Sequence, residues 1–427
     1  MDVVIITNSP GELSSWVKVT VEKLRKKAQD SIRIIVTLVP CPYASGREAE
    51  IAGGFPGIDL VLSPREFLGH LMGMPSRYRP APSGVVVFLG GDYWHAMMMS
   101  RKLGFPAVAY TDRPSSWGKY FRTVCVADER TKSALVAAGV PASQVTVVGN
   151  LMVEGVRPSL SREEALDSWG LSADRPLVGM FPGSRLYHVQ ASLSVFLRVA
   201  EDLAREVGDA QFALGLSPFL TTDELRGCLR TLPPPYLEGS RGELKEGKRG
   251  LAIVTGEGLH IPILQKQQYD LMNQSDLLLT IPGTNTAEIA CLGRPMVVAM
   301  SWRARIPRGG VASLLGALPM ASLVRREFLR SILRKVRYVA LPNVIAQREI
   351  VPEVRVEHEP GEISRVAADL LLDAERREEI GRELRSLMGS GGASDRIADV
   401  ILAAGPRLEA RSLPTGTAYL TEGKESA

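Results

Sequence analysis

Short apolar runs alternate with helical patterns from the first residues onward, and this alternation constrains the fold more than any other feature. The runs are rich in β-branched residues and are mostly apolar throughout, which is typical of parallel strands that are covered on both faces. Between them lie stretches with apolar residues at i, i+3 and i+4, such as Leu13–Lys27 and Asp128–Ala138. A βαβ series of this kind predicts an α/β fold with doubly wound parallel sheets.

The series divides into two lobes. The expected strands of the first lobe are Val3–Thr7, Ile32–Leu38, Asp59–Leu62, Val85–Leu89, Ala107–Tyr110, Val124–Ala127 and Val145–Val148. Those of the second lobe are Pro176–Phe181, Ala210–Leu216, Gly250–Val254, Leu277–Ile281 and Pro295–Ala299, whereas Glu238–Arg249 is expected to be a charged loop. We therefore expect two Rossmann-like lobes that face a cleft, over residues 1–165 and 166–404, the second with the terminal helices, and a disordered tail over 405–427.

Composition excludes several classes of protein. Of the 427 residues, 45% are hydrophobic and 23% are charged, as in ordinary globular proteins. The balance of 51 Lys and Arg against 47 Asp and Glu gives only +4, too little for a dedicated nucleic-acid binder. No apolar run approaches the roughly 18 residues of a membrane span, and no basic leader indicates a signal peptide. The four cysteines lie far apart without a CxxC motif, which favours reduced thiols in the cytoplasm and no metal site.

Two loops of the first lobe carry candidate catalytic groups, because ligands of such sheets bind beyond the carboxyl ends of the strands. Asn8–Ser14 follows the first strand and contains Glu12, and Gly90–His95 follows the fourth and contains Asp92. A carboxylate beside a buried strand can be desolvated, which raises its pKa toward that of a general base. His95 is an alternative base, and helix capping is the purely structural explanation for either carboxylate.

Two loops of the second lobe have the composition of anion sites. Phe181–Arg185 places Ser184 and Arg185 at a helix start. Ile281–Glu288 combines Gly and small hydroxyl residues at another helix start, where free N–H groups and the helix dipole would stabilise a diphosphate without a metal. Glu288 could accept hydrogen bonds from ribose hydroxyls, although a simple helix cap remains the alternative. The Walker pattern is absent, which argues against hydrolysis of nucleoside triphosphates, and no dinucleotide fingerprint follows the first strand.

Three further segments stand out. Leu341–Glu353 packs Asn, Arg and two Glu between two prolines, which favours a shaped loop over a solvated helix. Trp302–Arg337 carries nine Lys and Arg against one acid and could face an anionic membrane or be simply solvated. Phe67–Met74, beside Arg77, is an apolar helix that could receive acyl chains or belong to the core.

Taken together, the motifs resemble the lipid-A-disaccharide synthase family. The segments that carry the resemblance are FPGSR, PGTNTAEIACLGRPMVV, LPNVIAQREIVPE and GGASDRIADVIL. The resemblance implies the two-lobed GT-B glycosyltransferase architecture. It also implies transfer of 2,3-diacylglucosamine from UDP to the 6-hydroxyl of 2,3-diacylglucosamine 1-phosphate, with inversion and without an essential metal or cofactor.

The resemblance also assigns residues. Glu12 matches the acid of the family's GEASGD pattern, and Asp92 matches the presumed base of its DxPDFN stretch if one residue is deleted, whereas an ungapped match points to His95. The matches in the second lobe are Arg185 in PGSR, Gly283, Thr284 and Glu288 in SGTxTLE, and Asn343, Arg348 and Glu349 in LPNxxAxRE. The departures, SPGELSSW in the first loop, GGDYWH in the second and His188 where an acid is usual, lie mostly on the acceptor side and indicate a divergent paralogue.

The resulting hypothesis is a cytoplasmic glycosyltransferase, peripheral on the inner face of the membrane. Asp92, Glu12 and His95 are its catalytic candidates. The expected UDP-binding residues are Ser184, Arg185, Gly283, Thr284, Asn285, Thr286, Glu288, Asn343, Arg348 and Glu349. The lipid acceptor is expected along Phe67, Leu68, Leu71, Met72 and Arg77. A homodimer is allowed, and the alternatives are a different lipid acceptor, a UDP-GlcNAc 2-epimerase, or a binding protein without catalysis.

Overall fold

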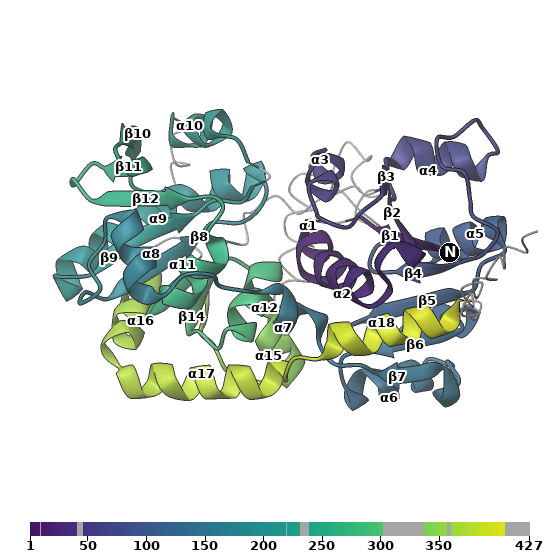
Figure 1. Cartoon of the computed structure of the whole chain (residues 1–427). Helices are drawn as coiled ribbons and strands as arrows, with labels where there is room; N and C mark the ends of the chain where they lie inside the picture. The colour runs from purple at the N-terminus through teal and green to yellow at the C-terminus, as the bar shows by residue number, and fades with distance from the viewer. Residues whose placement is uncertain are drawn as a thin grey trace, which may run out of the picture.

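The computed structural model describes residues 1–8, 10–40, 46–218, 220–230, 239–301, 337–356 and 360–405. It contains two lobes side by side, each built on one sheet with helices packed against it (Figure 1). The expected α/β fold with two doubly wound lobes is confirmed.

The first sheet has the order β3-β2-β1-β4-β5-β6-β7, and all of its strands are parallel. Each run expected in this lobe forms a strand. The strands are β1 (Asp2–Thr7), β2 (Arg33–Leu38), β3 (Leu60–Leu62), β4 (Gly84–Phe88), β5 (Ala107–Thr111), β6 (Thr123–Val126) and β7 (Val145–Val147). Chain order reverses between the neighbours β1 and β4, and this switch point is where sheets of this type bind ligands.

Both faces of this sheet are buried, which explains why its strands are apolar throughout. Val3 and Ile5 belong to the hydrophobic cluster on one face, whereas Val4 and Ile6 belong to the cluster on the other. The helices of the lobe are α1 (Pro10–Glu12), η1 (Leu13–Val17), α2 (Lys18–Ala28), η2 (Gln29–Ser31), α3 (Glu48–Gly53), α4 (Pro64–Leu71), α5 (Tyr93–Leu103), η3 (Ser116–Tyr120), α6 (Glu129–Ala137) and η4 (Ala142–Gln144). Two further helices, α7 (Leu151–Gly155) and α8 (Arg162–Trp169), lead to the second lobe.

The second sheet has the order β10-β11-β12-β9-β8-β13-β14-β15. Its strands are β8 (Leu177–Phe181), β9 (Gln211–Gly215), β10 (Gly242–Gly247), β11 (Gly250–Thr255), β12 (His260–Leu264), β13 (Leu277–Thr280), β14 (Met296–Ser301) and β15 (Glu353–Val356). The expected charged loop at Glu238–Arg249 is wrong at Gly242–Gly247, because these residues form β10, which pairs with β11 in an antiparallel hairpin. Charged side chains conceal an exposed edge strand from periodicity arguments, and they also protect such an edge from pairing with other chains.

The helices of the second lobe surround this sheet. They are α9 (Leu186–Val207), α10 (Thr222–Arg230), α11 (Gln268–Gln274), α12 (Thr284–Cys291), α15 (Leu341–Ala346), α16 (Gly361–Leu372) and α17 (Ala374–Met388). Most of the segment expected to be a shaped loop, Leu341–Glu353, is therefore helix α15 and the turn before β15.

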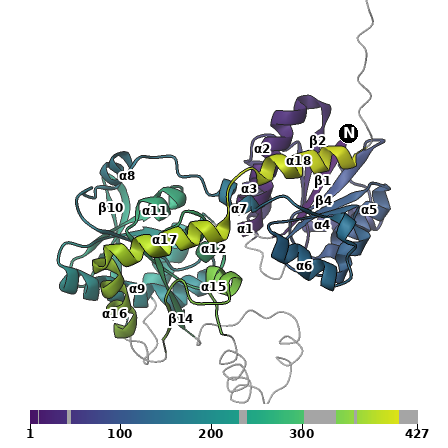
Figure 2. The ribbon, with the colours of Figure 1, turned by 90° about the horizontal axis from the view of Figure 1, so that it is seen from below.

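The last helix returns to the first lobe, contrary to the expectation that residues 166–404 form one unit. In Figure 2, α17 lies along the second lobe, and α18 (Ala393–Ala404) crosses to lie along the first. Ile397 and Ile401 join the core of the first lobe, and Asp395 pairs with Lys23 of α2 at 2.6 Å. Amphipathic periodicity shows that a helix needs a partner surface but not which lobe supplies it. The expected tail over 405–427 lies, apart from Gly405, outside the described residues.

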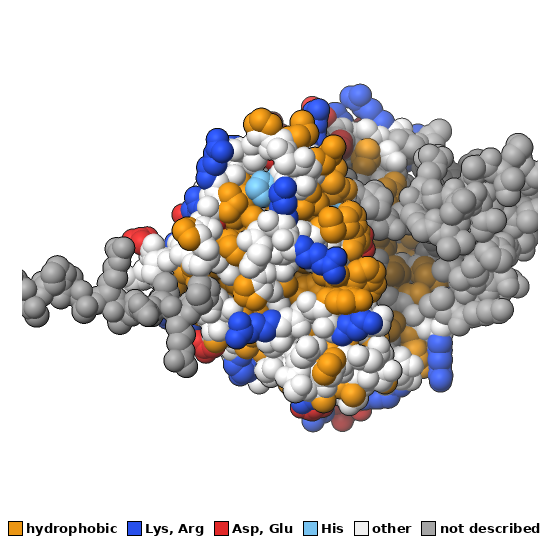
Figure 3. All heavy atoms as spheres, turned by 90° about the vertical axis from the view of Figure 1, so that its right-hand side faces the viewer, with side chains coloured by type: hydrophobic (Ala, Val, Ile, Leu, Met, Phe, Trp, Pro, Cys, Tyr) orange, Lys and Arg blue, Asp and Glu red, His pale blue; other side chains and the backbone are white. Residues whose placement is uncertain are grey.

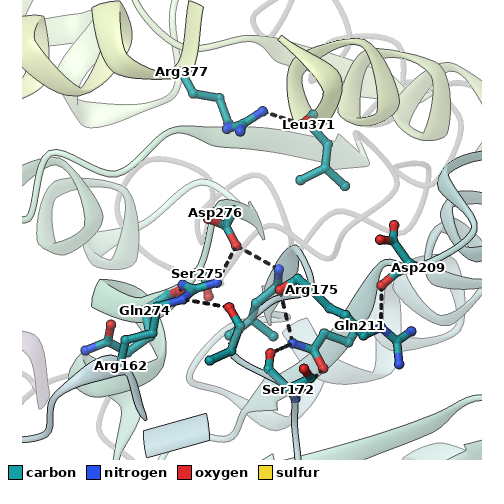
Figure 4. Close-up of polar contacts among 12 residues, drawn as sticks. Arg162, Ser172, Arg175, Asp209, Gln211, Gln274, Ser275, Asp276, Leu371 and Arg377 are labelled. Atoms are coloured by element: carbon teal, nitrogen blue, oxygen red, sulfur yellow. Dashed lines mark hydrogen bonds and ion pairs between the residues drawn. The ribbon is translucent and has the colours of Figure 1, made fainter. Parts of the chain in front are cut away.

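Arginines cap helix ends at the amino edge of the second sheet. The guanidinium of Arg162 donates to the carbonyl of Gln274, the last residue of α11, and pairs with Asp276 at 3.0 Å (Figure 4). Arg377 donates to the Leu370 carbonyl at 3.0 Å, near the end of α16. Cations at helix C-termini offset the negative ends of the helix dipoles. The positive ends of α9 and α12 lie at the opposite edge, where the candidate site is found.

Candidate functional site

The candidate site begins at the switch point of the first sheet. The carboxylate of Glu12, in the loop after β1, lies against Gly90, in the loop after β4. A β-carbon at Gly90 would lie 2.1 Å from Oε2 of Glu12, and the backbone of Gly90 has φ +125°. Only glycine fits such a position, both for space and for backbone conformation. The structure thus brings together the two loops that the sequence singled out in this lobe.

Asn8 is a residue of this site that the sequence reasoning passed over. Its Nδ2 atom would lie 3.2 Å from a β-carbon at Gly91, which has φ +92°. The amide therefore packs on the backbone of the residue before Asp92. Its position directly after β1, three residues before Gly11, was the available signal.

Asp92 occupies the N-cap position of α5, but its side chain makes no capping hydrogen bond. The side chain is exposed, so the expected partial desolvation is not observed. An exposed carboxylate without a capping role at a switch point is accessible to a substrate hydroxyl. The Asp92 side chain therefore does not cap α5, although helix capping was the structural explanation considered for it.

His95 and Phe67 are core residues, which corrects two expectations. His95 is 3% exposed, and its ring meets the Phe67 ring edge-on with 5.4 Å between centroids. Burial lowers the pKa of His95 below its usual value. Because a base must reach the proton it removes, the enclosed His95 is a poor alternative to Asp92. Phe67 is fully buried and does not line a lipid surface.

The two anion-site loops of the second lobe lie in contact with each other. A β-carbon at Gly183 would lie 2.7 Å from both Cδ1 of Ile281 and Cβ of His188. The helices α9 and α12 start at these loops, and neither N-cap, Arg185 or Gly283, makes a side-chain capping hydrogen bond. Two positive helix ends therefore point to the same region, as the expected diphosphate site requires.

His188 lies in the first turn of α9, next to the Gly183 loop. Burial and the neighbouring Arg185 lower the pKa of His188 to about 4. The imidazole is therefore neutral near pH 7 and neither adds to nor offsets the charge of Arg185.

The loops of the two lobes meet at Gly11 and Thr284. A β-carbon at Gly11 would lie 3.0 Å from Cγ2 and 3.1 Å from Oγ1 of Thr284. The residue before Glu12 thus touches the first residue of α12. This contact places the loop that holds Glu12 beside the helix start of the second lobe.

Glu288 lies inside α12, one turn from the helix start, and is 6% exposed. The hydroxyl of Tyr269 donates to its Oε1 at 3.2 Å. Burial raises the pKa of Glu288 to about 7. Near neutral pH this carboxyl group is therefore present in both its protonated and its ionised form. A ligand that donates hydrogen bonds would favour the ionised form.

Thr286 and Asn343 are buried and support the loops instead of facing the cleft. The Thr286 hydroxyl donates to the Gly283 carbonyl at 2.8 Å and accepts from the amide of Leu341 at 3.1 Å. Asn343 is fully buried and bonds the backbone of Val351 through both ends of its amide, at 2.8 and 3.0 Å. These two side chains are therefore unavailable to a nucleotide, and the expectation that they bind UDP directly is corrected.

Arg348 and Glu349 are exposed and contact a different part of the lobe. Arg348 pairs with Glu383 of α17 at 2.8 Å. Glu349 lines a hollow of about 290 Å³ together with residues of α16 and α17, among them Asp369 and Arg376. The structure does not show these two residues in contact with the Gly283 turn.

The outer face of the first lobe carries exposed apolar side chains. In the segment expected to receive lipid, Leu68 is 41% and Met72 is 78% exposed, whereas Leu71 is partly buried. Figure 3 shows hydrophobic side chains interspersed with Lys and Arg over this face. The exposed residues that extend it on α5 and η3, which the sequence analysis missed, are Trp94, Met98, Trp117 and Tyr120.

Arg77, the expected polar end of this surface, is held in an ion pair with Glu66, and this pair lowers the pKa of Glu66 to about 2. The basic segment noted at Trp302–Arg337 lies, apart from Arg337, outside the described residues. In the described part of the chain, no helix combines the length and the apolar character needed to cross a bilayer. The same residues include no cluster of three or more His, Cys, Asp or Glu side chains placed to hold a metal ion.

Comparisons with known proteins extend the resemblance found in the motifs. No family model matches the chain. Lipid-A-disaccharide synthase of Geobacter sulfurreducens is 30% identical over 271 residues, which are 62% of this chain and 58% of that protein. The resemblance to this family is confirmed. The lipid-A-disaccharide synthase of Syntrophotalea carbinolica is 23% identical over 374 residues, 81% of this chain and 82% of that protein. The chain thus spans less than three fifths of the first of these relatives.

Solved structures support the fold. The complex of S. aureus MnaA with UDP matches with a TM-score of 0.58 and 13% identity, covering 94% of this chain and 96% of that one. A UDP-GlcNAc 2-epimerase from Neisseria meningitidis, bound to UDP-GlcNAc, matches with a TM-score of 0.54 and 13% identity, covering 94% and 100%. At such low identity these likenesses establish the fold alone. The expected GT-B architecture is confirmed.

Proposed function

We propose that the protein is an inverting glycosyltransferase that joins UDP-2,3-diacylglucosamine to 2,3-diacylglucosamine 1-phosphate. The observation that carries this proposal is the contact of Gly11 with Thr284, which sets the Glu12 loop of one lobe against an uncapped helix start of the other. The relatives are named lipid-A-disaccharide synthases, which supports formation of a lipid A disaccharide, and the two substrates are those that the motif resemblance implies. The neighbouring carboxylate loop and helix start support the proposal, because it needs a base beside the diphosphate.

The donor would be bound by the second lobe. Its diphosphate would lie between the starts of α9 and α12, near Ser184, Arg185, Thr284 and Asn285, where N–H groups and helix dipoles favour negative charge. The ribose hydroxyls would donate to Glu288. In this proposal, residues of the chain make all of these interactions and no metal ion is needed.

The transfer would be a single displacement. Asp92 would take the proton of the acceptor 6-hydroxyl while that oxygen attacks C1 of the donor sugar from the face opposite the leaving group. The bond from C1 to the diphosphate oxygen breaks, and UDP departs with the bonding electrons. The uncapped helix starts and Arg185 would stabilise the negative charge that develops on UDP.

The acceptor would approach along the outer face of the first lobe. Exposed Leu68, Met72, Trp94 and Met98 would contact acyl chains, and neighbouring Lys and Arg would meet anionic headgroups. Leu71 would contribute the partly buried side of this surface. We therefore propose a peripheral association with the inner face of the membrane.

The test is product analysis after incubation with both lipid substrates, with and without EDTA. The expected products are the acylated disaccharide 1-phosphate and UDP in equal amounts, with activity retained in EDTA. Interconversion of free UDP-GlcNAc without transfer would instead identify an epimerase. Tight UDP binding without turnover would identify a binding protein, and transfer only to other lipid acceptors would identify a related transferase.

A further inference from the structure

Three neighbouring loops of the first lobe carry three carboxylates and one cation. Because β1, β4 and β5 are adjacent, the loops that follow them share one edge of the sheet. In the described parts of these loops, residues 8, 10–14, 89–93 and 111–115, the acids are Glu12, Asp92 and Asp112, and the single cation is Arg113. The sequence analysis did not single out the third loop.

The third loop is fixed to the loop that holds Asp92. The hydroxyl of Tyr93, the residue after Asp92, donates to Oγ1 of Thr111 at 2.7 Å and to the carbonyl of Arg113 at 3.3 Å. Thr111 Oγ1 also accepts from the amide of Arg113 at 3.1 Å. The Tyr93 ring stacks on Phe88 with 4.5 Å between centroids, and burial raises the pKa of Tyr93, so its hydroxyl remains a neutral donor.

The charged side chains of this fixed turn are themselves exposed. The side chain of Asp112 is 56% exposed and that of Arg113 is 87% exposed, and the shortest distance of their ion pair is 3.8 Å. A pair of this kind contributes little to stability. Arg130, another cation at this edge, differs from Arg113 because it donates to the Ile345 carbonyl of the second lobe.

An acceptor that carries a negative charge is repelled by the carboxylates at this edge. Its hydroxyl must reach the carboxylate base, which brings its phosphate toward the acids. Two like unit charges 4 Å apart repel by about 1 kcal/mol in water and about 4 kcal/mol at an effective dielectric constant of 20. An arginine on a loop next to those of the carboxylates would offset this repulsion, and its planar guanidinium can bind two oxygens of a phosphate monoester at once.

We propose that Arg113 binds the phosphate monoester of the acceptor and thereby determines acceptor specificity. This inference rests on the proposed transferase function and assigns a residue to its acceptor phosphate. Arg113 is a binding residue here and takes no part in proton transfer.

The experiment compares Arg113→Ala and Arg113→Lys with two acceptors, 2,3-diacylglucosamine 1-phosphate and the same lipid without its phosphate. Loss of a charged hydrogen-bonded contact of about 1.5–3 kcal/mol corresponds to a roughly 10- to 150-fold increase in KM. Arg113→Ala should show this increase for the phosphorylated acceptor alone, with kcat and the donor KM unchanged. Arg113→Lys should recover part of the loss. The matched control is Arg365→Ala, because Arg365 is an exposed arginine of α16 in the second lobe and its ion pair with Asp369 is also long, at 3.5 Å.

Equal changes of KM for both acceptors, or no change for either, would overturn the inference while leaving the transferase function intact. Absence of transfer by the unsubstituted protein would instead contradict the proposed function. In that case, calorimetric titration of the two lipids in the presence of UDP still decides the role of Arg113. A preference for the phosphorylated lipid that Arg113→Ala abolishes supports it, and equal binding of both lipids overturns it.

Discussion

The carboxylate of Glu12 lies over the α-carbon of Gly90, and a β-carbon there would be 2.1 Å from Oε2. Gly90→Ala should therefore displace Glu12 and the adjoining Asp92 loop. Misplacement of a reacting group by about 1 Å can cost on the order of 100-fold in rate, and we expect a loss of kcat of that size. Steady-state kinetics of the transfer reaction measure it.

The matched control is Gly250→Ala. Gly250 also has a strongly positive φ, at +111°, but a β-carbon there meets nothing within 4 Å. This control separates the cost of the strained backbone, about 1–3 kcal/mol of stability, from the clash with Glu12. Equal kcat values for the two variants would show that the position of Glu12 is unimportant.

The contact between Gly11 and Thr284 couples the two lobes. A β-carbon at Gly11 would lie 3.0 Å from Cγ2 of Thr284, so Gly11→Ala should push the α12 start away and weaken UDP binding about 3- to 10-fold, the effect of roughly 1 kcal/mol. Thr284→Ser removes that methyl group and should restore part of the affinity in the double variant, because Oγ1 still lies 3.1 Å from the added β-carbon. A double-mutant cycle by calorimetry measures the coupling, and strictly additive effects would contradict the contact.

Much of the architecture was predictable because each signal was local. Apolar β-branched runs and helical periodicity located every strand of the first lobe, and helix-start composition located the Gly183 and Gly283 loops. The meeting of these two loops, seen where Gly183 contacts Ile281, follows from the order of the strands. Strand order depends on packing between distant segments, which a single sequence does not report.

The errors have a common physical origin. His95 and Asn343 are polar residues that the motifs placed in the site, yet both are buried. A polar residue with buried partners looks the same in sequence as one that faces a ligand. Arg113 shows the opposite error, since it was passed over. The acids near which we propose that it acts, Glu12 and Asp92, lie on neighbouring loops and not in its own segment.

Asp92 and His95 should respond differently to substitution. Asp92→Asn should lower kcat by at least about 100-fold with unchanged stability, because the exposed side chain makes no capping bond and general-base catalysis contributes 10²–10⁴-fold. His95→Ala should instead lower the free energy of unfolding by about 2–4 kcal/mol, since it empties a buried site against Phe67. Kinetics and urea denaturation of both variants separate the two roles. Full activity of Asp92→Asn alongside an inactive, stable His95→Ala would assign the base to His95.

Glu288 should make stability depend on pH. Burial raises its pKa to about 7 in the folded chain, against a usual value of 4.5. Between these values the folded state holds a proton that the unfolded state has released, so stability falls as pH rises, by up to about 1.4 kcal/mol per pH unit. Glu288→Gln should flatten this slope and be more stable than the natural chain at pH 8.

Urea denaturation at pH 5, 6, 7 and 8 measures the effect, and Glu243→Gln, an exposed acid on β10, is the control. Glu288→Gln should also bind UDP more weakly, because a carboxylate accepts hydrogen bonds from ribose hydroxyls better than an amide does. A pH slope that survives Glu288→Gln would show that other groups titrate in this range.

Asn343 should matter for stability and not for donor binding. Its Oδ1 accepts from the amides of Ile350 and Val351, and its Nδ2 donates to the Val351 carbonyl and to Glu353. Asn343→Ala leaves several buried polar groups without partners, at about 1–3 kcal/mol each before relaxation, so we expect a loss of about 3–5 kcal/mol. Urea denaturation measures this loss, with Gln190→Ala, an exposed amide on α9, as the control.

The KM of Asn343→Ala for the donor should stay within about twofold under conditions where the variant is folded, because the buried amide has no free hydrogen-bonding capacity to offer a nucleotide. A large increase in donor KM at nearly unchanged stability would instead place Asn343 against UDP.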